Sequence, residues 1–151
     1  MHLDFAGKRG AMDFYSALSG LEQALWDIAG KALGVPVYNL LGGPCRDRIR
    51  VYANGWSSGD DSPAETARKA VALVERGFTA MKWDPFPGPW RPYISRAEEQ
   101  AAVASVRAVR ETVGPEIDLL IEVHRRLAPL PAVRVARMIE SYDPFLSLIH
   151  I

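Results

Sequence analysis

Apolar residues recur at helical spacing through the first well-patterned stretch of the chain, residues 12–33. Every third or fourth position there is apolar, which is the period of an α-helix with one buried face. The residues that carry this period are Leu18, Leu21, Leu25, Ile28 and Leu33. Gly34 and Pro36 follow, and such a pair is typical of a helix C-terminus. The pattern therefore predicts a helix over residues 12–33.

From residue 48 onward the pattern alternates between strand-like and helix-like stretches. Residues 48–53, 78–83 and 117–123 are short and apolar or β-branched, which predicts strands. Between and after them, residues 62–77, 95–114 and 132–142 have helical spacing. Ser62 and Ser95 each precede a glutamate by three positions, as N-cap residues do. Alternating strands and helices predict an α/β fold with a parallel sheet, either open and doubly wound or part of a barrel. No glycine-rich phosphate loop follows a strand, which counts against a nucleotide-binding open sheet.

Composition narrows the function classes. The chain has 151 residues, 48% of them hydrophobic and 24% charged, which is typical of one globular domain and not of a disordered chain. Eighteen basic and eighteen acidic residues give no net charge, so a nucleic-acid partner is not indicated. The single cysteine, Cys45, forms no internal disulfide. No apolar run is long enough to span a bilayer, and the first ten residues lack a signal peptide's apolar core. We therefore expect a cytoplasmic protein without a membrane partner.

Chemistry in parallel α/β folds lies at the carboxyl ends of the strands, which directs attention to residues 54–60, 82–84 and 122–126. Glu122 and His124 are two positions apart at the end of a predicted strand, so we expect both side chains on one face. A carboxylate there suits a hard cation such as Mg²⁺, and an imidazole beside it can move a proton. The alternative is a surface acid followed by a loop histidine.

Lys82 and Asp84 repeat this spacing at the end of the preceding strand. A lysine in an otherwise apolar strand is costly unless it is paired or lies at the mouth of a site. Two roles of Lys82 are therefore open: a cation that faces a substrate carboxylate, or one member of a structural Lys82–Asp84 ion pair. Trp83 is expected to point the other way, into the core. For Arg126, a role in binding an anionic substrate stands beside capping of neighbouring carbonyl groups.

The segment SALSGLEQALWDIAGKALGVPVYNLLGG, residues 16–43, closely resembles the signature of the enolase superfamily, in its mandelate racemase/muconate lactonizing enzyme group. RDRIRVYANGW, GFTAMKWDPF and DLLIEVHRRLAPLPAVRVARMIESYDPF resemble that family's first three barrel strands and the helices between them. The acid-x-His pattern at residues 122–124 resembles the galactonate dehydratase-like members. This resemblance implies a partial (β/α) TIM-type barrel with its first three strands, preceded by the C-terminal helical part of an α+β capping domain.

The resemblance also assigns boundaries and roles. Residues 1–45 would be a remnant of the capping domain and residues 46–145 the first βα units of the barrel. Glu122 would be the first Mg²⁺ ligand, and His124 would be the general acid that helps to expel the 3-hydroxyl group. Lys82 takes the place of the first lysine of the racemases' K-x-K motif, whereas Asp84 replaces the second, which argues against a two-base racemase. Apart from the resemblance, we predict that Asp84 and Arg126 contact the substrate.

The implied reaction is a dehydration of a small-molecule acid sugar. The proton next to the carboxylate is abstracted, a bound Mg²⁺ stabilises the enediolate, and water leaves to give a 2-keto-3-deoxy acid. Two alternatives stay open: a racemase, epimerase or cycloisomerase of the same superfamily with Lys82 as base, and a catalytically inert fragment or interaction module. The full-length parent is expected to be a homo-oligomer.

A whole barrel of this type needs eight strands and about 250 residues, so we expect the chain to be a fragment. The general base and the remaining metal ligands would lie beyond residue 151. We therefore expect poor Mg²⁺ affinity, no dehydratase activity and marginal or aggregation-prone behaviour, because the sheet edges are unpaired. The final LSLIHI, residues 146–151, resembles the translation of a sequencing adapter, and our hypothesis is that it is a non-native tail.

Overall fold

The computed structural model describes residues 12–89, 91–124 and 127–148. The chain divides into two compact units, residues 1–49 and 50–151. The first contains helix α2, Met12–Leu33, and the short helix α3, Val37–Leu40. Helix α2 has the predicted bounds, but Gly30 is its one buried residue. A Cβ atom at Gly30 would lie 2.9 Å from the Val35 carbonyl oxygen, so the glycine lets the chain fold back closely after the helix.

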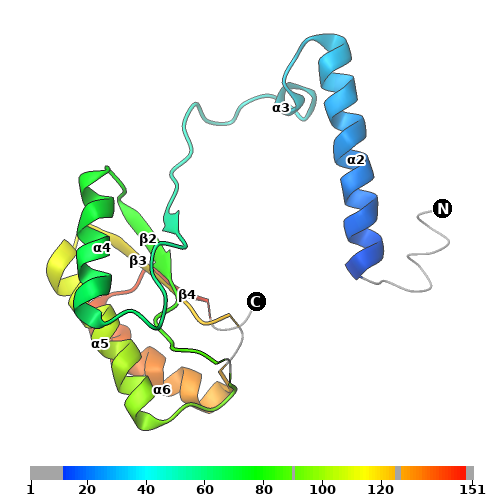
Figure 1. The fold of residues 1–151 in the computed structure, drawn as a ribbon. Coiled ribbons are helices and arrows are strands. Elements are labelled where there is room, and N and C mark those ends of the chain that lie inside the picture. Colours follow the sequence, from blue (N-terminus) through cyan, green and yellow to red (C-terminus); the bar gives the residue numbers. More distant parts are fainter. Residues whose placement is uncertain (1–11, 90, 125–126, 149–151) are drawn as a thin grey trace. The chain divides into compact units, whose positions relative to one another are not determined.

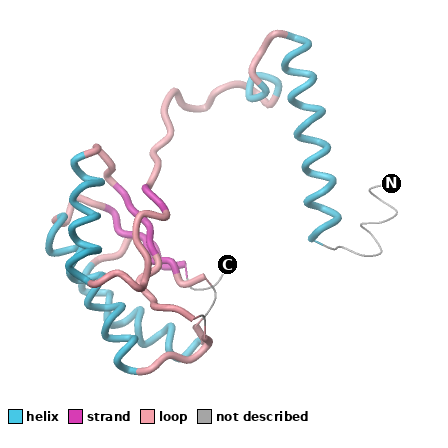
Figure 2. Tube along the Cα trace, viewed as in Figure 1, coloured by secondary structure: helices cyan, strands magenta, loops and turns pink. Residues whose placement is uncertain are grey.

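The second unit alternates strands and helices around one parallel sheet. Its elements are β1 Ala53–Asn54, α4 Pro63–Glu75, β2 Ala80–Trp83, α5 Arg96–Val113, β3 Asp118–Glu122, α6 Pro129–Ile139, the 3₁₀ helix η1 Glu140–Tyr142 and β4 Leu146–Leu148. The strands pair in the order β1-β2-β3-β4, and every pairing is parallel. Helices α4, α5 and α6 gather on one side of the strands (Figures 1 and 2). The predicted α/β fold with a parallel sheet is confirmed.

Local sequence signals explain the helix limits in this unit. The Ser62 hydroxyl accepts a hydrogen bond from the Glu65 amide, and Ser95 and Glu98 form a complete capping box at the start of α5. Helix α5 ends at Gly114, whose φ of 80° is a conformation that glycine adopts without strain. The predicted start signals and this predicted end are therefore confirmed.

The core lies between the sheet and the helices. Met81, Leu119 and Ile121 are fully buried, and Trp83 is 2% exposed, as predicted for a side chain that points into the core. The helices contribute small and branched residues to the same cluster: Ala70 and Leu73 from α4, Ala102, Val106 and Val109 from α5, and Ala132, Val135 and Ile139 from α6. The Trp83 indole N–H also lies 3.4 Å from the Ser105 hydroxyl on α5. Strand β2 is thereby fixed to α5 on the side away from Lys82.

Two strands differ from the prediction. The expected first strand, residues 48–53, is reduced to β1, because its other residues find no strand partner and Ile49 and Val51 are exposed. A fourth strand, β4, pairs with β3 through residues 146–148, a stretch expected to be a non-native tail. The origin of that stretch stays a prediction, and residues 149–151 lie outside the described residues. Among the helices of the described ranges, none is long and apolar enough to cross a membrane.

Candidate active site at the carboxyl edge of the sheet

The ends of β2 and β3 bring two predicted site residues into direct contact. The Lys82 ammonium donates a 2.6 Å hydrogen bond to Oε2 of Glu122, and each side chain is 12% exposed. In the parallel register, Lys82 lies beside Leu120. Glu122 therefore lies two positions further toward the carboxyl end of β3. The alternative of a Lys82–Asp84 ion pair is wrong in its partner, because Lys82 pairs across the strands with Glu122. The ion pair with Glu122 therefore offsets the free-energy cost of placing Lys82 in an apolar strand.

Glu122 is held as a carboxylate. Its second oxygen, Oε1, accepts a 2.9 Å hydrogen bond from the backbone N–H of His124. Burial alone would raise the pKa of Glu122, but the hydrogen bonds from Lys82 and from the His124 amide outweigh it and hold the pKa below its ordinary value. Glu122 is thus an ionised oxygen donor at the end of a central strand.

The position of His124 does not follow from the alternation of side chains along a strand. Strand β3 ends at Glu122, and His124 has a φ of 52°, in the left-handed region. The imidazole therefore lies beyond the strand and does not share a strand face with Glu122. Its ring nitrogen Nδ1 lies 3.1 Å from Oδ2 of Asp84, which follows the neighbouring strand β2. Two residues forty positions apart thus form a pair at this edge.

Asp84 has protein partners on both carboxylate oxygens. Oδ1 accepts a 2.9 Å hydrogen bond from the Phe86 backbone N–H, while Oδ2 faces His124. Its side chain is 18% exposed, against 47% for the imidazole. Its predicted contact with a substrate stays a prediction. Arg126, the other predicted substrate contact, lies outside the described residues.

One neighbour of this site was not singled out from the sequence. The Lys82 ammonium lies 5.7 Å from the centroid of the Tyr52 ring, which is within the range of a cation–π contact. Tyr52 immediately precedes β1 and belongs to the stretch whose strand pattern was recognised. The sequence indicates this contact only by an aromatic residue near the end of a predicted strand.

A second charge cluster, with Glu99 buried at its centre, lies between α5 and α6. Glu99 is fully buried and accepts hydrogen bonds from Arg96, at 3.0 Å, and from Arg134. The Arg134 hydrogen bond is the largest contribution that keeps the pKa of Glu99 below its ordinary value, against the effect of burial. Because every member lies on a helix, this cluster joins the two helices.

The donor chemistry of the site suits a hard divalent cation in part. Glu122 offers the carboxylate oxygen that Mg²⁺ prefers. Within residues 12–89, 91–124 and 127–148, however, no group of three or more His, Cys, Asp or Glu side chains lies close enough to hold a metal ion. By its chemistry and its place at the strand end, Glu122 fits as one oxygen ligand of such a site.

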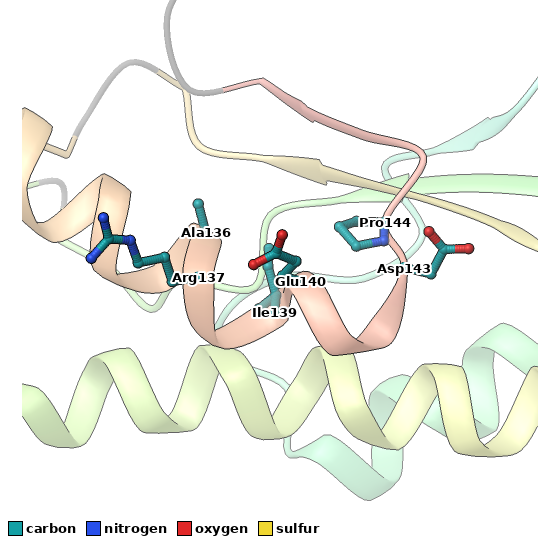
Figure 3. A pocket seen from close by; sticks show the side chains of 6 residues that line it. All are labelled: Ala136, Arg137, Ile139, Glu140, Asp143 and Pro144. Atoms are coloured by element: carbon teal, nitrogen blue, oxygen red, sulfur yellow. The ribbon is translucent and has the colours of Figure 1, made fainter.

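The pocket in Figure 3 lies away from these residues. It is lined by residues from the end of α6, from η1 and from the turn before β4: Ala136, Arg137, Ile139, Glu140, Asp143 and Pro144. These residues precede β4, so they belong to the amino edge of the sheet, opposite the ends of β2 and β3. Of the predicted site residues that the structure describes, none lines this pocket.

Comparisons with known proteins match both units of the chain. Residues 3–42 match the N-terminal domain of the mandelate racemase/muconate lactonizing enzyme family, and residues 65–147 match the enolase C-terminal domain-like family. A D-gluconate dehydratase of Thermoproteus tenax is 46% identical over 130 residues, which are 86% of this chain and 26% of that protein. A D-galactonate dehydratase of Variovorax paradoxus is 41% identical over 136 residues, which are 90% of this chain and 35% of that protein.

Solved structures agree with the sequence matches. A member of the enolase superfamily from Salmonella Typhimurium has a TM-score of 0.73 and 32% identity, over 82% of this chain and 36% of that one. The chain thus spans about a quarter to a third of the length of these relatives. The predicted partial barrel is confirmed as the corresponding part of an enolase-type fold. Because the C-terminal family match alone covers more than half of the sequence, the chain belongs to the mandelate racemase/muconate lactonizing enzyme group of the enolase superfamily.

Proposed function

We propose that the full-length protein is a dehydratase of acid sugars such as D-gluconate or D-galactonate. It would remove the proton next to the substrate carboxylate and then eliminate water from the neighbouring carbon by way of an enediolate. The observation that carries this proposal is the cluster of Lys82, Glu122, His124 and Asp84 at the ends of two adjacent parallel strands. The dehydratases named among its relatives support the substrate class.

Glu122 is the residue that we propose as a ligand for Mg²⁺. Its carboxylate is ionised, held by two hydrogen bonds and located at a strand end. A divalent cation bound there would stabilise the negative charge that develops on the substrate carboxylate as the α proton leaves. The Lys82 ammonium, next to Glu122, would add positive charge on the same side and attract an anionic substrate.

His124 is the residue that we propose as the general acid. A hydroxyl group leaves poorly as hydroxide, so elimination needs a proton donor near the departing oxygen. The His124 imidazole is about half exposed. The backbone N–H of His124 donates a hydrogen bond to the Glu122 carboxylate, which keeps the residue beside it. A substrate bound near Glu122 would therefore lie near a proton donor.

The contact of Lys82 separates this proposal from a racemase or cycloisomerase that uses Lys82 as its base. The lysine donates its hydrogen bond to Glu122, which suits a cation, and Asp84 occupies the position of the second lysine. An inert fragment or interaction module would need none of these contacts. We further propose that the full-length protein is a homo-oligomer, which its mass in solution would test.

The test uses the full-length protein with Mg²⁺ and a panel of aldonates that includes D-gluconate and D-galactonate. We expect formation of a 2-keto-3-deoxy acid, detected by its carbonyl group or by NMR, and loss of activity on chelation. The matched control is Arg107→Ala on the exposed face of α5, which should leave the rate unchanged. Exchange of the α proton with D₂O without water loss would favour an epimerase, and no reaction with any aldonate would refute the proposal.

A further inference from the structure

We propose that Asp84 is a positioning residue that binds Nδ1 of His124, so that the opposite ring nitrogen, Nε2, delivers the proton to the departing hydroxyl group. This inference rests on the proposed function, because it concerns the general acid of that reaction. It replaces the expected substrate contact of Asp84 with a contact to His124.

The geometry fixes which ring nitrogen is used. A carboxylate accepts hydrogen bonds and donates none, so the 3.1 Å contact requires Nδ1 of His124 to carry a hydrogen toward Oδ2 of Asp84. In the elimination step the Nε2–H bond breaks and its proton joins the leaving oxygen as the C3–O bond breaks. The enediolate electrons form the new C2–C3 double bond, and the products are water and the enol of the 2-keto-3-deoxy acid. The imidazole is left neutral with its remaining hydrogen still on Nδ1.

Both partners are anchored, so the pair is held in one geometry. The Phe86 amide donates to Oδ1 of Asp84, and the Phe86 side chain is 3% exposed. Gly59 approaches this loop so closely that a Cβ atom there would lie 1.8 Å from the Phe86 carbonyl oxygen. On the other side, the His124 backbone N–H is bonded to Glu122. Hydrogen bonds from fixed backbone groups support positioning of a reacting side chain.

Charge argues against direct binding of the substrate by Asp84. The proposed substrate carries a carboxylate, which a carboxylate side chain repels unless an ammonium group or a metal ion lies beside that side chain, as Lys82 and the proposed metal ion do for Glu122. Both Asp84 oxygens already accept hydrogen bonds from the protein, whereas the nearby Lys82 ammonium is the group with the sign that attracts an anion. The arrangement therefore assigns attraction to Lys82 and orientation of the imidazole to Asp84.

The experiment compares Asp84→Asn and His124→Asn in the full-length protein, with Glu111→Gln on the exposed face of α5 as the matched control. Three rates are measured with Mg²⁺: dehydration of the aldonate, exchange of its α proton with D₂O, and loss of fluoride from the 3-deoxy-3-fluoro analogue. Fluoride leaves with much less help from an acid, so its elimination reports on the site without the proton donor. We expect both site variants to lose about 10²- to 10⁴-fold in dehydration. Exchange and fluoride loss should stay within a few-fold of the parent.

The outcomes separate the two proposals. If His124→Asn loses dehydration and Asp84→Asn does not, the role of Asp84 is overturned and the proposed function stands. If Asp84→Asn loses all three rates equally, Asp84 acts on substrate binding or on the fold, and the inference is again overturned. If His124→Asn retains dehydration, the general acid is wrong and both proposals about it fail. Asp84→Ser repeats the test should Asp84→Asn not fold, and Asp84→Glu should recover part of the dehydration rate.

Discussion

The two edges of the parallel sheet use charged residues in different ways. At the amino edge, arginines donate mainly to backbone carbonyl groups, and Arg50, which bonds to the Thr79 carbonyl, also forms a 2.6 Å ion pair with Asp118. Arg110 bonds to four carbonyl groups, the oxygens of Gly114, Ile117, Tyr142 and Asp143, at 2.7–2.9 Å. At the carboxyl edge, charged side chains pair mainly with one another, as in Lys82–Glu122 and Asp84–His124.

This difference separates a structural edge from a functional one. A backbone carbonyl is a fixed acceptor, so an arginine bound to several of them holds the chain in place. A pair of side chains can instead exchange its partner for a cation or a substrate. In (β/α) barrels the chemistry lies at the carboxyl edge and residues at the opposite edge serve stability. We therefore expect substitutions at the carboxyl edge to affect activity first and those at the amino edge to affect stability first.

The largest effect is expected from replacing the Lys82–Glu122 pair by Met and Leu together. A buried ion pair exchanged for apolar residues of similar volume is often neutral or stabilising, so the free energy of unfolding should fall by less than about 1 kcal/mol. The full-length protein should nevertheless lose more than about 100-fold in dehydration rate, since even partners of metal ligands cost 10- to 100-fold. Urea unfolding and product formation measure the two quantities.

The single variants sharpen this result. Glu122→Gln leaves the Lys82 ammonium 12% exposed without its carboxylate, so it should be less stable than the double variant. A double variant that is active, or that unfolds several kcal/mol more easily than the parent, would contradict the division between the two edges.

Arg110→Ala should give the largest loss of stability at the amino edge. It leaves four carbonyl groups without their donor, in the turn before β3 and in the turn before β4. Hydrogen bonds from a charged donor contribute about 1.5–3 kcal/mol each, but water can replace part of them, so we expect about 3 kcal/mol in total. Urea unfolding monitored by near-ultraviolet circular dichroism gives the value. Arg107→Ala, on the exposed face of the same helix, should change stability by less than about 0.5 kcal/mol.

The sequence predicts the elements of this fold better than their pairing. Ser62, Ser95 and Gly114 set helix limits through local hydrogen bonds and backbone conformation, which depend on nearby residues alone. The pattern over residues 48–53 predicts a longer strand than β1, because a strand exists only where a neighbour pairs with it, and only Ala53 and Asn54 find partners in β2. Periodicity describes one element at a time and carries no information on such pairing.

The same limit applies to the candidate site. Because chemistry in such folds lies at strand ends, the sequence predicts Lys82, Asp84, Glu122 and His124 as site residues. The structure places all four at one edge of the sheet. Which residue pairs with which was not predictable, because it depends on the register between β2 and β3 and on the left-handed turn at His124. The close approach of Gly59 to Phe86 is also not predictable from the sequence, since a glycine in a polar loop does not indicate which residue it contacts.

Gly59→Ala tests whether part of the carboxyl edge is also structural. The new methyl group would meet backbone atoms of Phe86 at 1.8–2.0 Å, so one of the two loops has to move. Overpacking of this kind costs about 1–3 kcal/mol, and displacement of Phe86 should also reduce activity through Asp84. Gly88→Ala in the same loop is the control, because a Cβ there has no atom within 4 Å. Equal effects of the two substitutions in urea unfolding would refute the close approach.

The smallest expected effect is a dependence on pH that arises from Asp61, in the loop after β1. Its carboxylate accepts hydrogen bonds from Lys69 at 2.8 Å, from the Ser58 amide and from the Ser57 hydroxyl, and these lower its pKa from 3.8 to about 2. A carboxyl group with a lowered pKa stabilises the fold above its unfolded pKa. That stabilisation is lost as the pH falls from about 4 to about 2. We expect it to amount to about 1–2 kcal/mol, because the side chain is partly exposed.

The measurement is the difference in unfolding free energy between the parent and Asp61→Asn across this pH range. Other paired carboxylates, such as Glu99 and Glu122, lose their stabilisation in both proteins, so the difference isolates Asp61. It should be largest at neutral pH and shrink toward zero near pH 2. A difference that stays constant with pH would mean that hydrogen-bond geometry, and not charge, holds the loop. A shrinking difference would show that a charged pair at the carboxyl edge can also be structural when its partner lies on a helix, as Lys69 does on α4.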